Sequence, residues 1–591
     1  MRQLLHSLTK LRETFRTAPA CFETRGPTLA LMPFVLVAPL FLAGPIRCAT
    51  RLSLLASLVI ACIFCAAAIW VFRPWRWRRG AGALPVQFLT AEAATFAVSG
   101  FAVWALYNPD FGGFPNLDGW DGGTHVFIKD QFALAFPDIY NGQVAYYGFT
   151  WLLEKILGID AFRSFTLAFY VAVPATVVFP MLVSFSVISQ TGGSKLLGLA
   201  GAAAVVVFAS LGVLLVVILP LMHYNQAAGY YAHVFGLLPL LALWAADSQI
   251  RHPLLRVGAL LCGLALVRYT YSLNLADVAV AVAALLLVDG ARRWHRLGQA
   301  VLALGLIATA FWLASQIAPI FRIWGGMQGF PMTDLLKADM ILLAGLFLYA
   351  ATHARGSAES SLLGSPLVRA LRFPLFFAAA NGAFFAHFRQ GKGVQYYYPM
   401  KYQIWACILL ALALVVMLAH FAVALLQKGA WRAPRIWLGA GLVAGVLATV
   451  PPIWLTTFSE YRVTLQERMR PHRPPYRYLR PLADVEGISR IKAVLSSQHK
   501  RFGGYLTSFF PMFSFMNGTL GLHSGRQEFF PPATLPGTCA FWVSRERDIY
   551  RLGPADKLDA LRSNVAAAGS TCAEYPVPWK TTPQSLCYHY Y

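Results

Sequence analysis

Long apolar runs, separated by short polar and basic segments, dominate the pattern of this chain. A helix that crosses a bilayer needs about 20 mostly apolar residues, and about 13 runs approach that length. They cover residues 29–46, 52–72, 85–107, 164–189, 196–219, 232–247, 254–268, 273–289, 299–319, 339–353, 373–388, 402–426 and 435–457. The pattern therefore predicts an α-helical polytopic membrane protein with about 13 transmembrane helices.

The composition supports this prediction. The 591 residues are 57% hydrophobic and only 13% charged, whereas an ordinary soluble domain has roughly 25% charged residues. The net charge of +23 would by itself suggest a nucleic-acid partner. Much of the excess Lys and Arg, however, flanks apolar runs, where the positive-inside rule places them. We therefore interpret the charge as a signal of topology and expect no nucleic-acid partner.

The basic segments also predict an orientation. If residues 1–28 form a retained cytoplasmic tail, alternate loops are cytoplasmic, and each of these loops contains Lys or Arg. Those residues are Arg73, Arg76, Arg78, Arg79, Lys195, Arg251, Arg256, Arg292, Arg293, Arg296, Arg355, Arg369, Arg372, Lys428, Arg432 and Arg435. We expect a transmembrane domain over residues 29–457, with a large extracytoplasmic loop at 108–163. An extracytoplasmic α/β domain then follows at 458–591.

The first loop on the far side of the membrane holds the strongest candidate chemistry. Its sequence Leu-Asp-Gly-Trp-Asp-Gly-Gly-Thr-His carries Asp118, Asp121 and His125. A flexible backbone here presents acid/base and metal-binding groups that a simple connector does not need. The alternative is an Asp/Gly-rich turn, since both residues dominate turns for backbone reasons. Beyond it, residues 124–136 have a mostly apolar face and predict a short helix lying in the membrane interface.

Other far-side segments collect cations, histidines and tyrosines. Ionisable residues at the membrane edge are costly and usually face a cavity. A fixed positive charge can hold a phosphate, and a carboxylate can deprotonate an acceptor. Each residue also has an ordinary interpretation as a snorkelling cation, a helix-end contact or an interfacial aromatic. Together they predict a site for a lipid-linked phosphate, and the residues are His223, Tyr224, Asn225, His233, Arg268, Lys392, Tyr396, Tyr397, Tyr398 and Lys401.

The cysteines fall into an apolar group and a polar group. Those in apolar runs are most simply small core residues, namely Cys62, Cys65, Cys262 and Cys407. Cys539, Cys572 and Cys587 lie in the far-side C-terminal region. One disulfide among these three is expected there, and the sequence leaves its pairing open. The chain has no Rossmann or P-loop glycine motif and no zinc-spaced Cys/His set.

This layout resembles the GT-C superfamily of membrane glycosyltransferases. The resemblance covers the whole chain in architecture, with many spans, an acidic first extracytoplasmic loop and an extracytoplasmic C-terminal domain. Members use polyprenyl-phosphate-linked sugars, and an Asp or Glu in that loop serves as base or metal ligand, a position that Asp118 and Asp121 match. Within the superfamily the plan is most similar to bacterial arabinofuranosyltransferases. This chain departs from the pattern, because its two aspartates are not adjacent and its acidic loop follows the third run.

The resemblance implies transfer of a sugar from a polyprenyl-phosphate-linked donor to a hydroxyl of a glycan, lipid or protein in the cell envelope. Asp121 or Asp118 would act as general base or hold a divalent cation such as Mg²⁺, Mn²⁺ or Ca²⁺, assisted by His125. Arg268, Lys392 and Lys401 would stabilise the departing phosphate. The alternatives are a lipid-linked glycan ligase or polymerase, a flippase or transporter, and an assembly subunit whose C-terminal domain binds a partner.

Overall fold

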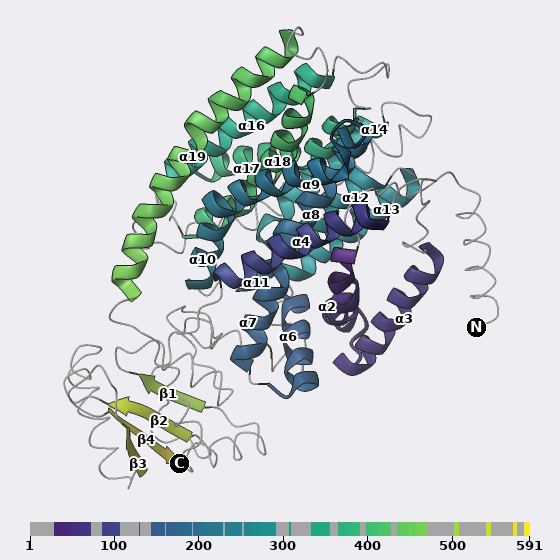
Figure 1. The fold of residues 1–591 in the computed structure, drawn as a ribbon. Coiled ribbons are helices and arrows are strands. Elements are labelled where there is room, and N and C mark those ends of the chain that lie inside the picture. Colours follow the sequence, from purple (N-terminus) through teal and green to yellow (C-terminus); the bar gives the residue numbers. More distant parts are fainter. Residues whose placement is uncertain are drawn as a thin grey trace, which may run out of the picture.

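The computed structural model shows a bundle of helices followed in the chain by a small β-sheet (Figure 1). It describes residues 29–72, 85–106, 129, 143–159, 161–191, 193–227, 231–250, 253–290, 307–308, 332–354, 365–389, 397–426 and 434–469, and residues 502–506, 539–544, 571–575 and 584–590 of the sheet. The helices are η1 (Leu29–Leu31), α2 (Met32–Thr50), α3 (Leu54–Phe72), α4 (Pro85–Leu106), α6 (Val144–Leu157), α7 (Ala161–Ala172), α8 (Ala175–Gln190), α9 (Gly193–Val213), η4 (Leu214–Ile218), α10 (Leu219–Ala227), α11 (Tyr231–Phe235), α12 (Leu237–Gln249), α13 (Pro253–Thr270), η5 (Ser272–Asn274), α14 (Leu275–Gly290), α16 (Met332–Ala354), α17 (Pro366–Arg389), α18 (Tyr397–Leu426) and α19 (Pro434–Met469).

The described helices have the properties of membrane-spanning segments. Six of them are long and apolar enough to cross a bilayer, over Leu29–Thr50, Leu167–Gln190, Ala200–His223, Leu336–His353, Lys401–Leu426 and Ile436–Thr456. Shorter apolar helices cover Leu54–Ala68, Thr90–Leu106 and Ser272–Val288. Large apolar side chains also remain exposed on the outside, with Leu36 72%, Trp104 71% and Phe208 75% exposed. A surface of this kind suits lipid better than water, so the chain is a helical membrane protein.

Helices occupy each apolar run expected from the sequence except 299–319, which lies outside the described residues apart from 307–308. The bounds of the observed helices differ most from those of the predicted runs where a helix continues into polar sequence. α16 begins at Met332 and α17 at Pro366, whereas α19 continues to Met469. The apolar pattern detects only the part of a helix that matches the bilayer, and a helix can extend beyond it into water or headgroups. The helix α6 was not predicted, because it lies inside the loop 108–163.

The bundle is built around α18. Its side chains from Lys401 to Met417 are all buried, including Trp405 and Cys407 at 0% exposed. Helices α8, α9, α16 and α17 pack directly against it. A helix that is apolar all round and enclosed by others belongs to the core of the bundle. Polar groups on α18 therefore face neighbouring helices and not lipid.

Polar contacts between helices are grouped at the two ends of the bundle. The far end is defined here as the end where α18 begins and the near end as the one where α17 begins. Near-end contacts join Trp244 of α12 to the carbonyl of Ala370 of α17 (2.6 Å), and Tyr349 of α16 to His420 of α18 (2.9 Å). Such sorting is expected of helices that alternate in direction along the chain. The far-end contacts form the candidate site.

Near the start of the chain, α2 and α6 cross at a close approach between glycines. A Cβ atom added to Gly44 would lie 2.1 Å from the carbonyl oxygen of Val144, and one added to Gly148 would lie 2.8 Å from Cα of Gly44. Small residues allow helix backbones to meet in this way inside membranes. The contact holds part of the long loop 108–163 against the first apolar helix.

The C-terminal strands form one mixed four-stranded sheet in the order β1-β2-β4-β3. The strands are β1 (Phe502–Leu506), β2 (Cys539–Ser544), β3 (Thr571–Tyr575) and β4 (Gln584–Tyr590). β1 pairs with β2 in parallel, and the other pairs are antiparallel. The register places Cys572 directly opposite Cys587, whereas Cys539 lies opposite Tyr590. The side chains of these cysteines lie outside those described, so the disulfide expected among them stays a prediction.

Candidate functional site

Near its far end, α18 carries three consecutive buried polar side chains. Lys401 is 6% exposed, and Tyr402 and Gln403 are each 1% exposed. Successive residues of an α-helix point about 100° apart, so these side chains face different neighbouring helices. Each of them lies against polar groups of a different part of the bundle. We call this set of contacts the polar belt.

Lys401 lies beside a histidine that is held in place by hydrogen bonding and aromatic packing. His233 of α11 is 1% exposed, and the backbone of Lys401 lies next to its imidazole. Its Nδ1 lies 3.0 Å from Oδ1 of Asn225, whose Nδ2 donates to the Leu221 carbonyl (2.7 Å). The imidazole stacks on Trp405 with ring centroids 5.4 Å apart. The imidazole is therefore held by Asn225 and by the aromatic rings of Trp405 and Tyr271.

Tyr402 faces a buried carboxylate. Its hydroxyl donates to Oδ1 of Asp277, which lies in the first turn of α14. Oδ2 of Asp277 accepts from Nδ2 of Asn274 and of Asn381, each at 3.0 Å. Asp277 and both asparagines are 0% exposed. This network joins η5, α14, α17 and α18 at one depth in the bundle.

Gln403 faces a second buried carboxylate. Its Nε2 donates to Oδ2 of Asp339 of α16 (2.6 Å), and Cys407, one turn further along α18, also contacts this carboxylate. Asp339 is 3% exposed. Among the described residues, Oδ1 of Asp339 and Oε1 of Gln403 have no hydrogen-bond partner. The belt thus contains two aspartates within apolar segments, and ionisable residues there are generally functional.

Aromatic packing connects the loop 108–163 to the belt through α11. Phe235, two residues after His233, contacts Phe149 of α6 at 4.9 Å between ring centroids and Tyr146 at 5.5 Å. Burial beside Tyr231 and Tyr147 raises the pKa of Tyr146 well above its usual value, so its phenol stays neutral. The loop that carries the aspartate motif is therefore attached next to the helix that positions His233.

One residue of that loop forms a buried ion pair. Lys129 is helical and 0% exposed, and its Nζ pairs with Oε2 of Glu154 on α6. The ammonium also lies 5.8 Å from the ring centroid of Phe165 of α7. A buried charge is stable only when it is paired in this way. The position of Lys129 is thus fixed by α6 and α7, a few residues after the aspartate motif.

The structure brings together some of the predicted site residues. Asn225 is hydrogen-bonded to His233, and Lys401 lies near this pair. His223 is exposed, and Arg268 is half-buried and makes no hydrogen bond or ion pair with another described residue. The side chains of Tyr224, Tyr397 and Tyr398 lie outside those described, although their backbones are helical. Asp118, Asp121, His125, Lys392 and Tyr396 lie outside the described residues altogether.

The predicted ligands of the expected divalent cation, Asp118 and Asp121, lie outside the described residues. Within the described ranges, no group of three or more His, Cys, Asp and Glu residues has the arrangement of a metal centre. No protein-family model, no curated protein and no solved structure matches this chain. The functional argument therefore depends on the polar belt and on the sequence motif.

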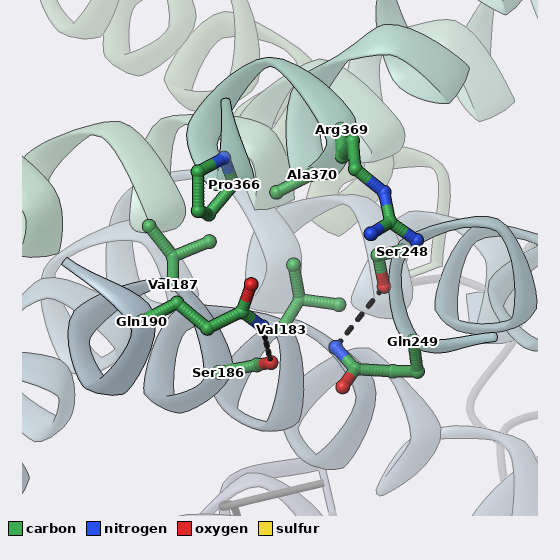
Figure 2. A pocket seen from close by; sticks show the side chains of 9 residues that line it. All are labelled: Val183, Ser186, Val187, Gln190, Ser248, Gln249, Pro366, Arg369 and Ala370. Carbon is green, nitrogen blue, oxygen red and sulfur yellow. Dashed lines mark hydrogen bonds between the residues drawn. The ribbon is translucent and has the colours of Figure 1, made fainter. Parts of the chain in front are cut away.

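A hollow at the near end contributes little to this argument. It has a volume of about 200 Å³, including solvent space at its mouth, and lies between α8, α12 and α17. In Figure 2 the amides of Gln190 and Gln249 bond to Ser186 and Ser248, at 2.9 and 3.2 Å, below Arg369. Pockets for drug-sized ligands have roughly 300–1,000 Å³. The hollow is too small for a lipid-linked sugar.

Sequence analysis missed Asp277, Asp339 and their partners. The predicted site residues lie in far-side loops or beside apolar runs, whereas these aspartates belong to the apolar runs 273–289 and 339–353. The sequence does contain a signal for them, because a carboxylate within an apolar run is costly to bury and therefore points to a function. The partners Asn274, Asn381 and Gln403 could not be assigned, since their contacts depend on which helices are neighbours.

Proposed function

We propose that this chain is a membrane glycosyltransferase that takes its sugar from a polyprenyl-phosphate-linked donor. The acceptor is a hydroxyl group on the extracytoplasmic face of the bacterial plasma membrane. In this proposal the far end of the bundle and the C-terminal sheet are extracytoplasmic, and the N-terminus is cytoplasmic. The wider resemblance to arabinofuranosyltransferases is part of the proposal.

The reaction exchanges one bond at the anomeric carbon for another. The acceptor oxygen attacks that carbon, and the bond from the carbon to the phosphate oxygen breaks with its electron pair leaving on the phosphate. Asp121 or Asp118 takes the acceptor proton, or holds a divalent cation beside the phosphate. The lysine ammonium of Lys401 stabilises the charge that develops on the leaving polyprenyl phosphate, together with Arg268 and Lys392.

The observation that carries the proposal is the burial of Lys401 near His233 at the far end. Lysine is almost never fully buried unless a partner or a function holds it there. The surrounding Trp405 and Tyr271 rings, 5.7 Å apart between centroids, supply flat surfaces of the kind on which sugars and isoprenoid chains pack. The attachment of the loop 108–163 beside α11 supports the approach of the aspartate motif to the same region.

The test measures release of polyprenyl phosphate, a product common to every sugar donor of this class. The full chain is reconstituted into liposomes with a panel of polyprenyl-phosphate sugars and acceptors, and both products are followed by mass spectrometry. The proposal predicts coupled formation of polyprenyl phosphate and a new glycosidic bond. Asp121→Asn and Asp118→Asn are assayed separately, and at least one should lower the rate by about 10²–10⁴-fold, the usual contribution of a general base.

The matched control is Asp110→Asn, which makes the same substitution in the same loop outside the motif. It should retain the wild-type rate. Full activity of both Asp118→Asn and Asp121→Asn, at equal protein levels, would remove the proposed base and metal ligand. Loss of activity on adding EDTA, reversed by Mg²⁺, Mn²⁺ or Ca²⁺, would assign the aspartates to a cation.

A transporter of lipid-linked glycans is the second candidate, and the buried carboxylates Asp277 and Asp339 favour it. Carboxylates inside transmembrane bundles often lie on ion or proton pathways. The same liposomes separate the two functions. A transporter would move the intact lipid-linked glycan between leaflets and form no glycosidic bond, whereas the proposed enzyme forms that bond.

A further inference from the structure

The hollow at the near end lies where three helices reach the end of the bundle. α8 ends at Gln190, α12 ends at Gln249 and α17 begins at Pro366, and these three residues all line the hollow. A candidate membrane span also ends at Gln190. Because the end of a span lies where hydrocarbon gives way to headgroups, the hollow is at headgroup depth. Its volume of about 200 Å³ includes solvent space at the mouth, so a group can enter from outside.

The charge that lines the hollow is positive. Arg369 lines it, and no carboxylate does so among the described residues. Figure 2 shows the guanidinium extending from α17 toward Ser248. Its Nη2 donates to the carbonyl of Ile250 (3.3 Å), and a guanidinium has five N–H groups in all. The carboxylate of Asp247, next to Ser248 in the chain, is bound by Arg372 at 2.5 and 2.8 Å. The group that an arginine in such a hollow attracts most strongly is an anion such as a phosphate.

A buried amide oxygen in the same hollow needs a hydrogen-bond donor. Gln249 is 6% exposed, and Figure 2 shows its amide turned from α12 toward α8. Its Nε2 donates to Oγ of Ser248 (3.2 Å), whereas its Oε1 has no hydrogen-bond partner among the described residues. The Ser248 hydroxyl donates to the carbonyl of Ala245 (3.0 Å) and so does not supply the missing donor. A ligand with a hydroxyl group beside an anionic group would satisfy both Gln249 and Arg369.

From this combination we propose that the hollow binds the glycerol-phosphate headgroup of an anionic lipid. A phosphate oxygen accepts from Arg369, and a glycerol hydroxyl donates to Oε1 of Gln249. Val183 and Val187 of α8 offer apolar surface to the glycerol carbons. The acyl chains stay in the bilayer outside, so a hollow too small for a lipid-linked sugar suffices. Basic pockets between transmembrane helices are a usual setting for acidic lipid headgroups.

The chemistry of the lining separates this headgroup from the common zwitterionic ones. A choline headgroup has no hydroxyl or N–H group to donate to Gln249. An ethanolamine headgroup could donate, but it would place a second positive charge beside Arg369, which costs free energy. A bound glycerol phosphate would bridge α8, α12 and α17, which supply the lining. The inference is independent of the proposed transferase activity.

The test measures lipid binding to the purified, delipidated full chain in detergent by native mass spectrometry. Short-chain phosphatidylglycerol, phosphatidylethanol, phosphatidylethanolamine and phosphatidylcholine are titrated at constant ionic strength. We expect a saturable site that prefers phosphatidylglycerol to the two zwitterionic lipids roughly fivefold, the effect of one arginine on an anionic lipid. Phosphatidylethanol has the same charge without the hydroxyls, and it should bind about three- to tenfold more weakly than phosphatidylglycerol, the net effect of one hydrogen bond. Equal affinity for all four lipids would overturn the proposal.

Free glycerol phosphate separates the two sources of this headgroup. It has the same polar groups as the lipid but no acyl chains to remain in the detergent micelle. We expect it to compete only at much higher concentration than the short-chain lipid. Displacement of phosphatidylglycerol by an equal concentration of glycerol phosphate would assign the hollow to a soluble compound and contradict the lipid assignment.

Matched variants locate the site. Arg369→Gln should weaken phosphatidylglycerol binding roughly fivefold or more and remove the preference over phosphatidylcholine. Arg256→Gln makes the same change at the start of α13, outside the lining, and should bind as the wild type does. Equal phosphatidylglycerol affinity of wild type and Arg369→Gln contradicts the proposal. If Arg369→Gln cannot be purified folded, Gln249→Leu takes its place, since it keeps the size of the side chain and removes the amide oxygen. It should bind phosphatidylglycerol and phosphatidylethanol equally, and an unchanged preference for phosphatidylglycerol would equally contradict the proposal.

Discussion

Lys401 is the residue on which the functional account depends most. Lys401 is only 6% exposed, and it lies near the far end of a helix whose side chains are mostly apolar. Lysine near a membrane edge ordinarily extends its charge toward headgroups. Lys401 is instead buried inside the bundle, near His233. A fixed charge in such a low-dielectric environment acts strongly on an anion that enters.

Replacing Lys401 with Gln should lower the release of polyprenyl phosphate by about a hundredfold, the usual effect of removing one group that stabilises developing negative charge. Gln keeps most of the length of the side chain and removes the charge. Lys337→Gln is the control, because Lys337 is exposed and lies on α16 two residues before the belt residue Asp339. Thermal unfolding of both variants checks their folding. A folded Lys401→Gln protein with the wild-type rate would show that this charge has no part in the reaction.

At the scale of single elements, the apolar pattern predicted which segments are helical but not where polar helices lie. Each described run is helical, although 164–189 and 232–247 are each divided between two helices, because apolar length and absence of charge determine membrane helices locally. α6 was missed, since its helix lies in a loop and its burial comes from packing on α2 and α11. The belt could also be predicted only in part, because many of its contacts depend on which helices are neighbours. His233, Asn225 and Lys401 stand out as polar residues beside apolar runs, whereas the partners of Asp277 depend on tertiary contacts.

The crossing of α2 and α6 gives a prediction at this scale. Gly44→Ala should lower the free energy of unfolding by roughly 1–3 kcal/mol, the usual cost of overpacking a tight contact. The added methyl would overlap the Val144 carbonyl. Gly100→Ala on α4 is the matched control, because nothing lies within 4 Å of the position of its new Cβ. Thermal or denaturant unfolding of both variants in detergent provides the measurement, and equal stabilities would contradict the close crossing.

At the scale of the whole molecule, the far end gathers charged and polar groups that a bundle of apolar helices does not need for stability. The belt draws on α10, α11, α14, α16, α17 and α18, and the aromatic contacts of Phe235 join α6 to it. Burying such groups costs free energy unless they are satisfied or used. The near end, by contrast, has the Arg372–Asp247 pair at 2.5 and 2.8 Å and a hollow too small for a lipid-linked sugar.

The central claim is that one extracytoplasmic cavity unites Lys401 with the aspartate motif. The most direct test is a cryo-EM structure of the full chain with bound polyprenyl phosphate, read for the position of the phosphate. The account predicts a phosphate oxygen within about 4 Å of Nζ of Lys401, the distance of an ion pair, and the carboxylate of Asp118 or Asp121 on the same cavity. A phosphate bound at another surface, or both carboxylates facing away from it, would contradict the account.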